Sequence, residues 1–463
     1  MILALLLAFA TTTPSALPDD AVIALIMVDR FADGAPNGPD VVQGGLRRFQ
    51  GGDLTGVRVK LPYLQALGVT HLWLTPLHQQ VADVEGTAPY HGYWPQQLDA
   101  VDPHFGSLAD LQALVRDAAT MQIGVVLDVV TNHFGYGASD PLQLVRKQCG
   151  DDETTSCLFG LPDLATEEER IQAVVVDKTL WWVRQAPIAG FRIDAFKHVD
   201  RQTSSAIRQG ARALRPGFFT LAEQWGTGPG DAVVDDIISS GAADAVFDFG
   251  LMGLARDFVK GRMRSAAFAH HLVERDAVAA GGPPMLPFLD NHDTETWTHA
   301  VGSSRSPIGA ALLLTNRGVP VVTWGTELQR EGGPQDPENR TFMPWERASS
   351  SSSLTFWSRL IQLRRSSPAT RAGALRIRAL DVADAPRFVV YDRQHGRQRV
   401  VVAVALDRAL RHLEPLARDT QIDDVIAWHG SAARKDGSLV IDVEKDGAVV
   451  VVLRERPVSR EVP

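Results

Sequence analysis

The stretch SLADLQALVRDAATMQIGVVLDVVTNH, residues 107–133, joins an amphipathic pattern directly to a nearly continuous apolar run. The first part, 107–121, is typical of a helix with one buried face. The second part, 123–133, stays apolar until polar residues close it. A strand this apolar indicates a parallel sheet that helices cover on both faces. The stretch therefore predicts one unit of an α/β fold.

The same unit recurs along the chain. Apolar, β-rich runs alternate with amphipathic segments such as 54–68 and 204–215. The eight predicted strands are 21–31, 69–76, 123–133, 190–196, 218–225, 244–251, 285–293 and 319–327. Eight such units most naturally close into a (β/α)8 TIM barrel.

Two regions depart from this alternation. Residues 134–166, after the third strand, are rich in Gly, Asp, Pro and Thr, and a connection this long usually carries function. From residue 373, β-like runs follow one another without helices, which predicts an antiparallel β-sandwich domain. We expect a barrel over 19–133 and 167–372, an inserted loop domain B over 134–166, and a C-terminal β domain over 373–463.

Charge and the N-terminus limit the partners and the location. A formal net charge of −9 argues against a nucleic-acid partner. Residues 1–18 resemble a secretory signal peptide, although a short buried element is the alternative. That run is too short to span a membrane, and no later segment spans one either. We expect a secreted or periplasmic protein without membrane insertion, in which Cys149 and Cys157 form a loop-closing disulfide or stay free thiols.

Polar residues gather at the ends of four predicted strands, where barrels of this kind carry their active sites. They are Asp128, Asn132, His133, Arg192, Asp194, Glu223, Asn291, His292 and Asp293. One such residue could be a helix cap, but four strands together favour a shared site. At least three carboxylates would converge, which suits glycoside hydrolysis or metal binding. The first strand ends in Val28-Asp29-Arg30 rather than in the His-x-His of barrel metallohydrolases, which favours the hydrolysis.

At these residues the sequence resembles the α-amylase family, the retaining α-glucan enzymes of glycoside hydrolase family 13. The similarity to its four diagnostic segments lies in DVVTNH (128–133), GFRIDAFKH (190–198), LAEQW (221–225) and FLDNHD (288–293). The resemblance implies that Asp194 is the nucleophile, Glu223 the general acid/base and Asp293 the carboxylate that stabilises the transition state. In a glycosidase that retains the anomeric configuration, the carboxyl groups of the nucleophile and the acid, here Asp194 and Glu223, should lie about 5–5.5 Å apart.

The resemblance also implies which residues contact the sugar. They are His91, Tyr93, His133, Phe159, Arg192, Lys197, His198, Trp225 and His292. Packing at the base of a loop is the alternative for His91 and Tyr93. Phe159 falls near the position of a central aromatic residue in cyclodextrin-forming relatives.

A calcium ion, Ca2+, is a further implication of the resemblance. Its ligands would be the side chains of Asn132 and Asp163 and the backbone carbonyl of His198. The acidic ligand that domain B normally adds has no clear match, and Asp151, Asp152 and Glu153 are candidates only. The cysteines fall where some relatives carry a disulfide. A second site could use Asp33, Asn37 and Asp53, although an ordinary turn is favoured there.

We expect a monomeric hydrolase of α-glucan substrates that cleaves internal α-1,4 bonds. The sequence shows one β domain and not the extra C-terminal domains of cyclodextrin-forming relatives, which favours hydrolysis over transfer. A cyclomaltodextrinase or glucanotransferase is the related alternative. A catalytically silent carbohydrate-binding protein is the alternative from another class, and the three carboxylates disfavour it.

Overall fold

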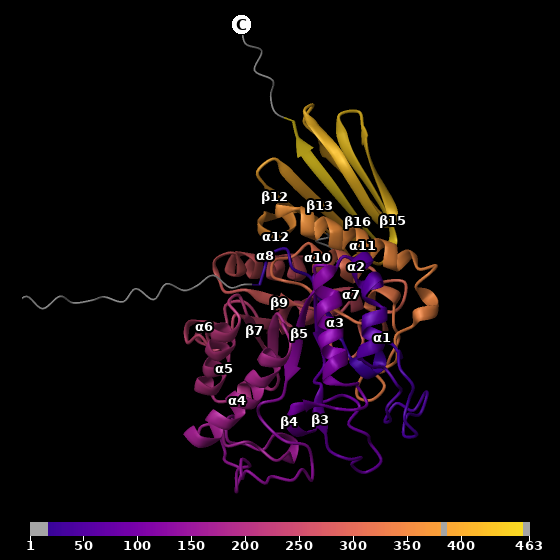
Figure 1. Ribbon diagram of the computed structural model, residues 1–463. Coiled ribbons are helices and arrows are strands. Elements are labelled where there is room, and N and C mark those ends of the chain that lie inside the picture. Colours follow the sequence, from indigo (N-terminus) through magenta and orange to yellow (C-terminus); the bar gives the residue numbers. More distant parts are fainter. Residues whose placement is uncertain (1–16, 381–386, 457–463) are drawn as a thin grey trace, which may run out of the picture.

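A computed structural model describes residues 17–380 and 387–456, so the predicted signal peptide lies outside it except for Leu17 and Pro18 (Figure 1). Eight parallel strands form one sheet in the order β10-β1-β2-β5-β6-β7-β8-β9. Their bounds are β1 Ile23–Ile26, β2 His71–Leu74, β5 Gly124–Val129, β6 Gly190–Ile193, β7 Phe219–Ala222, β8 Ala245–Asp248, β9 Met285–Pro287 and β10 Val321–Thr323. The two ends of this order meet, because the Val319 N–H donates to the Met285 carbonyl at 2.9 Å. The predicted barrel is confirmed.

Helices alternate with these strands and cover the sheet (Figure 1). Their bounds are α1 Leu54–Val59, α2 Leu61–Leu67, α3 Leu108–Thr120, α4 Glu169–Gln185, α5 Arg201–Leu214, α6 Ala232–Ser239, α7 Phe249–Lys260, α8 Ser265–Gly281, α9 Trp297–Val301, α10 Ile308–Leu314, α11 Ser352–Ser366 and α12 Pro368–Ala372. Helix α3 buries Leu111, Leu114 and Val115 on one face, and Ser107 caps its N-terminus. Among the residues described, no helix has the length and hydropathy needed to cross a membrane.

The predicted strands were too long at their C-terminal ends. The run 244–251 stops being a strand at Asp248, whose carboxylate accepts the Leu251 N–H and caps α7. Similarly, β1 gives way to a 3-10 helix at Val28–Arg30. Apolar periodicity alone cannot separate the end of a buried strand from the start of a buried helix. An antiparallel pair, β3 (His78–Gln80) and β4 (Pro95–Val101), was not predicted.

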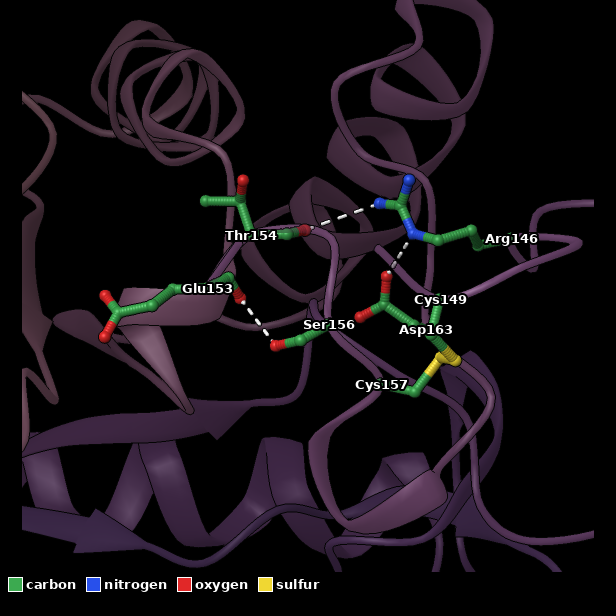
Figure 2. Close-up of a disulfide and its surroundings, with 7 residues drawn as sticks. All are labelled: Arg146, Cys149, Glu153, Thr154, Ser156, Cys157 and Asp163. Atoms are coloured by element: carbon green, nitrogen blue, oxygen red, sulfur yellow. Dashed lines mark hydrogen bonds and ion pairs between the residues drawn. A yellow bond between two sulfur atoms is a disulfide. The ribbon is translucent and has the colours of Figure 1, made fainter. Parts of the chain in front are cut away.

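The inserted segment 134–166 contains little regular structure beyond a 3-10 helix at Leu158–Gly160. Isolated bridges pair His133 with Asp163 and Val145 with Leu164, so both ends of the segment lie against each other. Cys149 and Cys157 form a disulfide, with Cα atoms 5.4 Å apart, which confirms the loop-closing bridge (Figure 2).

The C-terminal β domain is confirmed as antiparallel. Its strands are β11 Ala374–Leu380, β12 Phe388–His395, β13 Gln398–Ala405, β14 Leu410–Pro415, β15 Thr420–Lys435 and β16 Ser438–Glu455. The first half of β16 pairs with β14 and the second half with β13, so one sheet contains all six. Alternate residues face opposite sides: Val400 and Val402 join the barrel core, whereas Val401 and Ala403 form a second core. The sheet lies beside α10, α11 and α12 (Figure 1).

Candidate active site

A cleft of about 800 Å³ opens at the C-terminal ends of the barrel strands. Asp194 follows β6, Glu223 follows β7, and Asp293 lies beyond β9. All three line the cleft. The barrel therefore brings together the three predicted catalytic carboxylates, which are far apart in the sequence.

Arg192 connects three carboxyl groups from three neighbouring strands. Its Nη1 donates to Asp194 Oδ1 at 2.6 Å and to Asp128 Oδ1 at 2.9 Å. Its Nη2 lies 2.7 Å from Glu223 Oε1. The side chain is 1% exposed and does not line the cleft. Its guanidinium is directed at the carboxyl groups, so a direct contact of Arg192 with the sugar stays a prediction.

Glu223 sits where a carboxylic acid keeps its proton. Its Oε2 accepts the Ala195 N–H at 2.9 Å, and Ala195 adopts the left-handed region with φ of 44°. Burial raises the pKa of Glu223 to about 8, with Asp194 and Asp293 adding to the rise and Arg192 opposing it. A protonated carboxyl at neutral pH is what a general acid requires.

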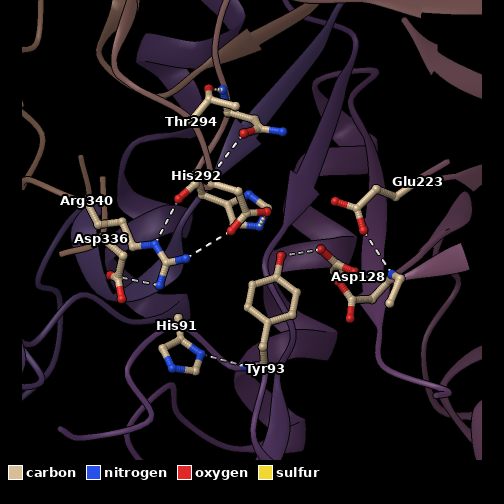
Figure 3. A network of polar contacts seen from close by, with 12 residues as sticks. His91, Tyr93, Asp128, Glu223, His292, Thr294, Asp336 and Arg340 are labelled. Carbon is tan, nitrogen blue, oxygen red and sulfur yellow. Dashed lines mark hydrogen bonds and ion pairs between the residues drawn. The ribbon is translucent and has the colours of Figure 1, made fainter. Parts of the chain in front are cut away.

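Asp293 has the opposite environment. Arg340 Nη2 donates to its Oδ1 at 3.0 Å, and His292 Nε2 lies 3.0 Å from its Oδ2 (Figure 3). Burial alone would raise the pKa of Asp293, but His292 and Arg340 hold it below its usual range. Two carboxyls of one cleft are thus kept in different protonation states at neutral pH.

Arg340 and Asp336 belong to this cleft and were missed by the sequence analysis. Arg340 Nη1 lies 3.1 Å from Asp336 Oδ1, which also accepts the Tyr90 O–H at 2.8 Å (Figure 3). Both cleft residues come from the segment after β10, where no apolar period or family segment marks them. The one available signal is the Gly- and Pro-rich composition of 332–337, which indicates a long loop.

The segment 90–94 forms one wall of the cleft. The Tyr93 O–H donates to Asp128 Oδ2 at 2.7 Å, and the Tyr93 ring stacks on His292 with centroids 5.0 Å apart. Gly92 has φ of 90°, and a Cβ there would lie 2.2 Å from the Pro76 carbonyl oxygen. Only glycine fits this turn. The turn aims His91 and Tyr93 at the cleft, which both of them line (Figure 3).

The remaining predicted sugar contacts also line the cleft. They are His133, Phe159, Lys197, His198, Trp225 and His292. Phe159 is 85% exposed and Trp225 is 50% exposed, so their rings offer uncovered apolar surface. Lys197 Nζ lies 2.9 Å from Glu153 Oε1, which ties it to the inserted segment.

The predicted calcium ligands do not fit a calcium ion. Asp163 Oδ2 accepts a hydrogen bond from Arg146 Nε at 2.9 Å, so a protein cation already neutralises this carboxylate. The other Asp163 oxygen has no hydrogen-bond partner. No cluster of three or more His, Cys, Asp or Glu side chains that could hold a metal occurs in residues 17–380 and 387–456. Calcium favours several oxygen ligands with acidic charge among them, and Asp163, the one carboxylate of the predicted set, is already paired with Arg146.

Two of the three acidic candidates, Glu153 and Asp152, are engaged in other contacts. Glu153 pairs with Lys197, and its carbonyl lies 2.7 Å from His198 Nδ1. Asp152 Oδ1 accepts backbone N–H groups of Thr154 and Thr155. At the second possible site, Asp53 caps α1 through Gly56 N–H at 2.6 Å and Asn37 donates to Asp33 at 2.7 Å, as an ordinary turn does.

Comparison with known proteins agrees with this geometry. The family model described as "Alpha amylase, catalytic domain" matches residues 25–148. A cyclomaltodextrin glucanotransferase from Klebsiella oxytoca is 28% identical, over 82% of this chain and 70% of that protein. A cyclomaltodextrinase from Geobacillus thermopakistaniensis is 29% identical, over 83% and 68%. These matches assign the chain's similarity to the α-amylase family.

Structural similarity extends this family assignment to the whole fold. An Anoxybacillus α-amylase superposes with a TM-score of 0.80 at 26% identity, covering 95% of this chain and 99% of that one. The similarity to this family together with the three-carboxylate cleft indicates that the protein is a glycoside hydrolase.

Proposed function

We propose that this protein is a retaining α-glucan hydrolase that cleaves internal α-1,4-glucosidic bonds of starch-like polysaccharides and maltooligosaccharides. One observation carries the proposal: Asp194 and Glu223 are held on the two Nη atoms of one guanidinium, inside an open cleft. A retaining mechanism needs a nucleophile and an acid about 5–5.5 Å apart, and two carboxyls on one guanidinium favour such a short separation.

The charges around Arg192 support two-step chemistry. In the free enzyme Asp194 is the anion and Glu223 holds the proton. When Glu223 donates its proton to the glycosidic oxygen and Asp194 bonds to the anomeric carbon, the negative charge moves from one carboxyl to the other. Both carboxyls contact Arg192, so the guanidinium keeps the same number of anionic partners. Water then attacks the anomeric carbon, Glu223 takes back a proton, and Asp194 is released.

The cleft walls support a glucan chain as the substrate. Sugar rings present apolar C–H faces as well as hydroxyls, so they suit aromatic rings beside polar groups. Tyr93, Phe159 and Trp225 all line the cleft, and the rings of Phe159 and Trp225 are exposed. An internal bond requires sugar binding on both sides of the cleavage point, which such a distribution permits.

A cyclomaltodextrinase or glucanotransferase is the second candidate. The exposed Phe159 ring favours it, as do the names of the two relatives reported above. A catalytically silent carbohydrate-binding protein is disfavoured, because the acid, the nucleophile and the third carboxylate are all in place.

Product analysis on starch, cyclodextrin, pullulan and maltotriose separates these functions, with Glu223→Gln as the inactive control. Rapid loss of iodine-staining starch with little cyclodextrin turnover supports the proposal. Preferential opening of cyclodextrin, or new cyclic products from starch, supports the second candidate. Sugar binding without release of reducing ends from any of the four substrates at any pH would show that the protein is not an enzyme.

We also propose that the protein is secreted or periplasmic and acts as a monomer. The Cys149–Cys157 disulfide supports an oxidising compartment. Cell fractionation and light scattering of the purified protein test both statements. Recovery in the reduced cytosolic fraction, or a dimer mass, would contradict the corresponding statement.

A further inference from the structure

Arg146 binds oxygens from three separate parts of the chain around domain B. Its Nε donates to Asp163 Oδ2 at 2.9 Å, and its Nη2 donates to the Thr154 carbonyl at 3.4 Å (Figure 2). Its Nη1 and Nη2 also donate to the two carboxylate oxygens of Glu167, at 2.6 and 2.9 Å. One guanidinium thus connects the middle of the insertion, its end and the approach to helix α4.

These partners are the kinds of oxygen that a structural calcium ion takes. Calcium in proteins binds carboxylates together with backbone carbonyls from different chain segments. Arg146 likewise binds two carboxylates and a carbonyl, with its side chain only 11% exposed. A planar guanidinium satisfies such oxygens in fixed directions, and its charge cannot be lost near neutral pH.

Further contacts complete the attachment of the insertion to the barrel. Lys197, which follows β6, pairs with Glu153, and His198 Nδ1 lies 2.7 Å from the Glu153 carbonyl. The Arg146 N–H also donates to the Asp163 carbonyl at 2.7 Å. The insertion carries Tyr136, Leu158, Phe159 and Leu161 of the cleft lining, so these contacts fix one wall of the substrate site.

We propose that the guanidinium of Arg146 takes the structural place of the calcium ion that the family resemblance implies, so that domain B is held without a metal. A divalent cation on Asp163 would lie next to the guanidinium and be repelled by it. The single partnerless oxygen of Asp163 shares its carboxylate with this guanidinium, and Glu153, an acidic candidate of the insertion, is paired with Lys197.

Calcium content and thermal unfolding of the unaltered protein give the first test. We expect no bound calcium by elemental mass spectrometry, and the same Tm in excess EDTA as in excess calcium chloride. A ligand at about a hundred times its Kd would raise the Tm of a chain of this length by on the order of 3 °C. One calcium ion per chain, or a fall of that size in EDTA, would overturn the proposal.

A matched pair of variants gives the second test. Arg146→Met removes the cation at similar length, whereas Lys147→Met removes the same charge from an exposed neighbour that forms no ion pair within the described part of the chain. Because it leaves the buried Asp163 carboxylate without its partner, Arg146→Met should lower Tm by about 3–5 °C. Lys147→Met should leave Tm unchanged.

Limited chymotrypsin digestion locates the effect. In Arg146→Met we expect faster cleavage within 134–166, whereas Lys147→Met should be cleaved like the unaltered protein. Arg146→Lys, which retains one positive charge, should fall between the two variants. Equal Tm and equal cleavage rates for Arg146→Met and the unaltered protein would overturn the proposal. If Arg146→Met fails to fold, the calcium measurements on the unaltered protein still decide it.

Discussion

The protonated state of Glu223 makes folding stability depend on pH in a predictable direction. Burial raises its pKa from the ordinary 4.5 to about 8. Because the folded-state pKa is the higher one, the stability that this carboxyl contributes is fully present below the unfolded pKa. It is then lost as pH rises through the folded pKa. Glu223→Gln keeps the shape of the side chain and cannot ionise, so the variant lacks this loss.

The size of the effect follows from the pKa difference. One pKa unit corresponds to about 1.4 kcal/mol, so the unaltered protein loses about 1.4 kcal/mol of unfolding free energy for each pH unit in this window. Over the whole window the difference between variant and unaltered protein grows by at most on the order of 5 kcal/mol. For a chain of this length that corresponds to roughly 5 °C in Tm.

Thermal unfolding at a series of pH values measures this difference directly. Glu223→Gln and the unaltered protein are compared from about pH 5 to about pH 9, where we expect the Tm gap to widen in favour of the variant up to about pH 8 and then to level off. Glu346→Gln is the matched control, because its side chain is 75% exposed and forms only a loose pair with Arg347. A Tm gap that stays constant across this pH range would refute the protonated buried acid.

Three further predictions follow from the same site. The kcat/KM of the unaltered protein should fall about tenfold per pH unit above roughly pH 8, because only protonated Glu223 can donate a proton to the leaving oxygen. A kcat/KM that stays unchanged well above pH 8 would contradict the role of Glu223 as the acid. Arg192→Met leaves buried carboxyls without their cation, so chemical denaturation should show a loss of about 3–5 kcal/mol together with greatly reduced turnover. Native-like stability and turnover would show that the guanidinium is dispensable. Phe159→Ala and Trp225→Ala each remove an exposed ring, and each should raise KM for maltooligosaccharides about tenfold, or ~1.4 kcal/mol, with Tm unchanged. An unchanged KM would exclude that ring from sugar binding.

The barrel and its carboxylates could be predicted because both depend on short-range patterns. A strand buried on both faces must be apolar throughout. In a closed parallel sheet, the C-terminal ends of all strands lie on the same side of the barrel. Arg192 and Asp194 are two residues apart around β6, which places them on one face. That spacing allows their contact, which the structure has at 2.6 Å.

Loop residues could not be placed in this way. Arg340 reaches Asp293 across 47 positions of sequence, and Tyr90 reaches Asp336 across 246. No period links such pairs, because their contact depends on how irregular loops cross the mouth of the barrel. Strand ends were also misjudged, since Asp248 continues an apolar run while its carboxylate already caps a helix.

The calcium prediction shows the limit of a resemblance. Asn132, Asp163 and His198 stand at matching positions, and a motif records nothing about the groups beside them. Arg146 lies 17 positions before Asp163, within a polar stretch that gives no sign of a buried cation. Only the folded insertion brings the guanidinium onto that carboxylate.

The central claim is that Asp194 and Glu223 cleave α-glucosidic bonds with retention. Proton NMR of a maltooligosaccharide digest, recorded before the products mutarotate, measures the configuration at the newly formed reducing end. The account predicts the α-anomer first, because two inversions at the same carbon restore the starting configuration. Initial appearance of the β-anomer would contradict it, since water would then have attacked directly and Asp194 would not be the nucleophile.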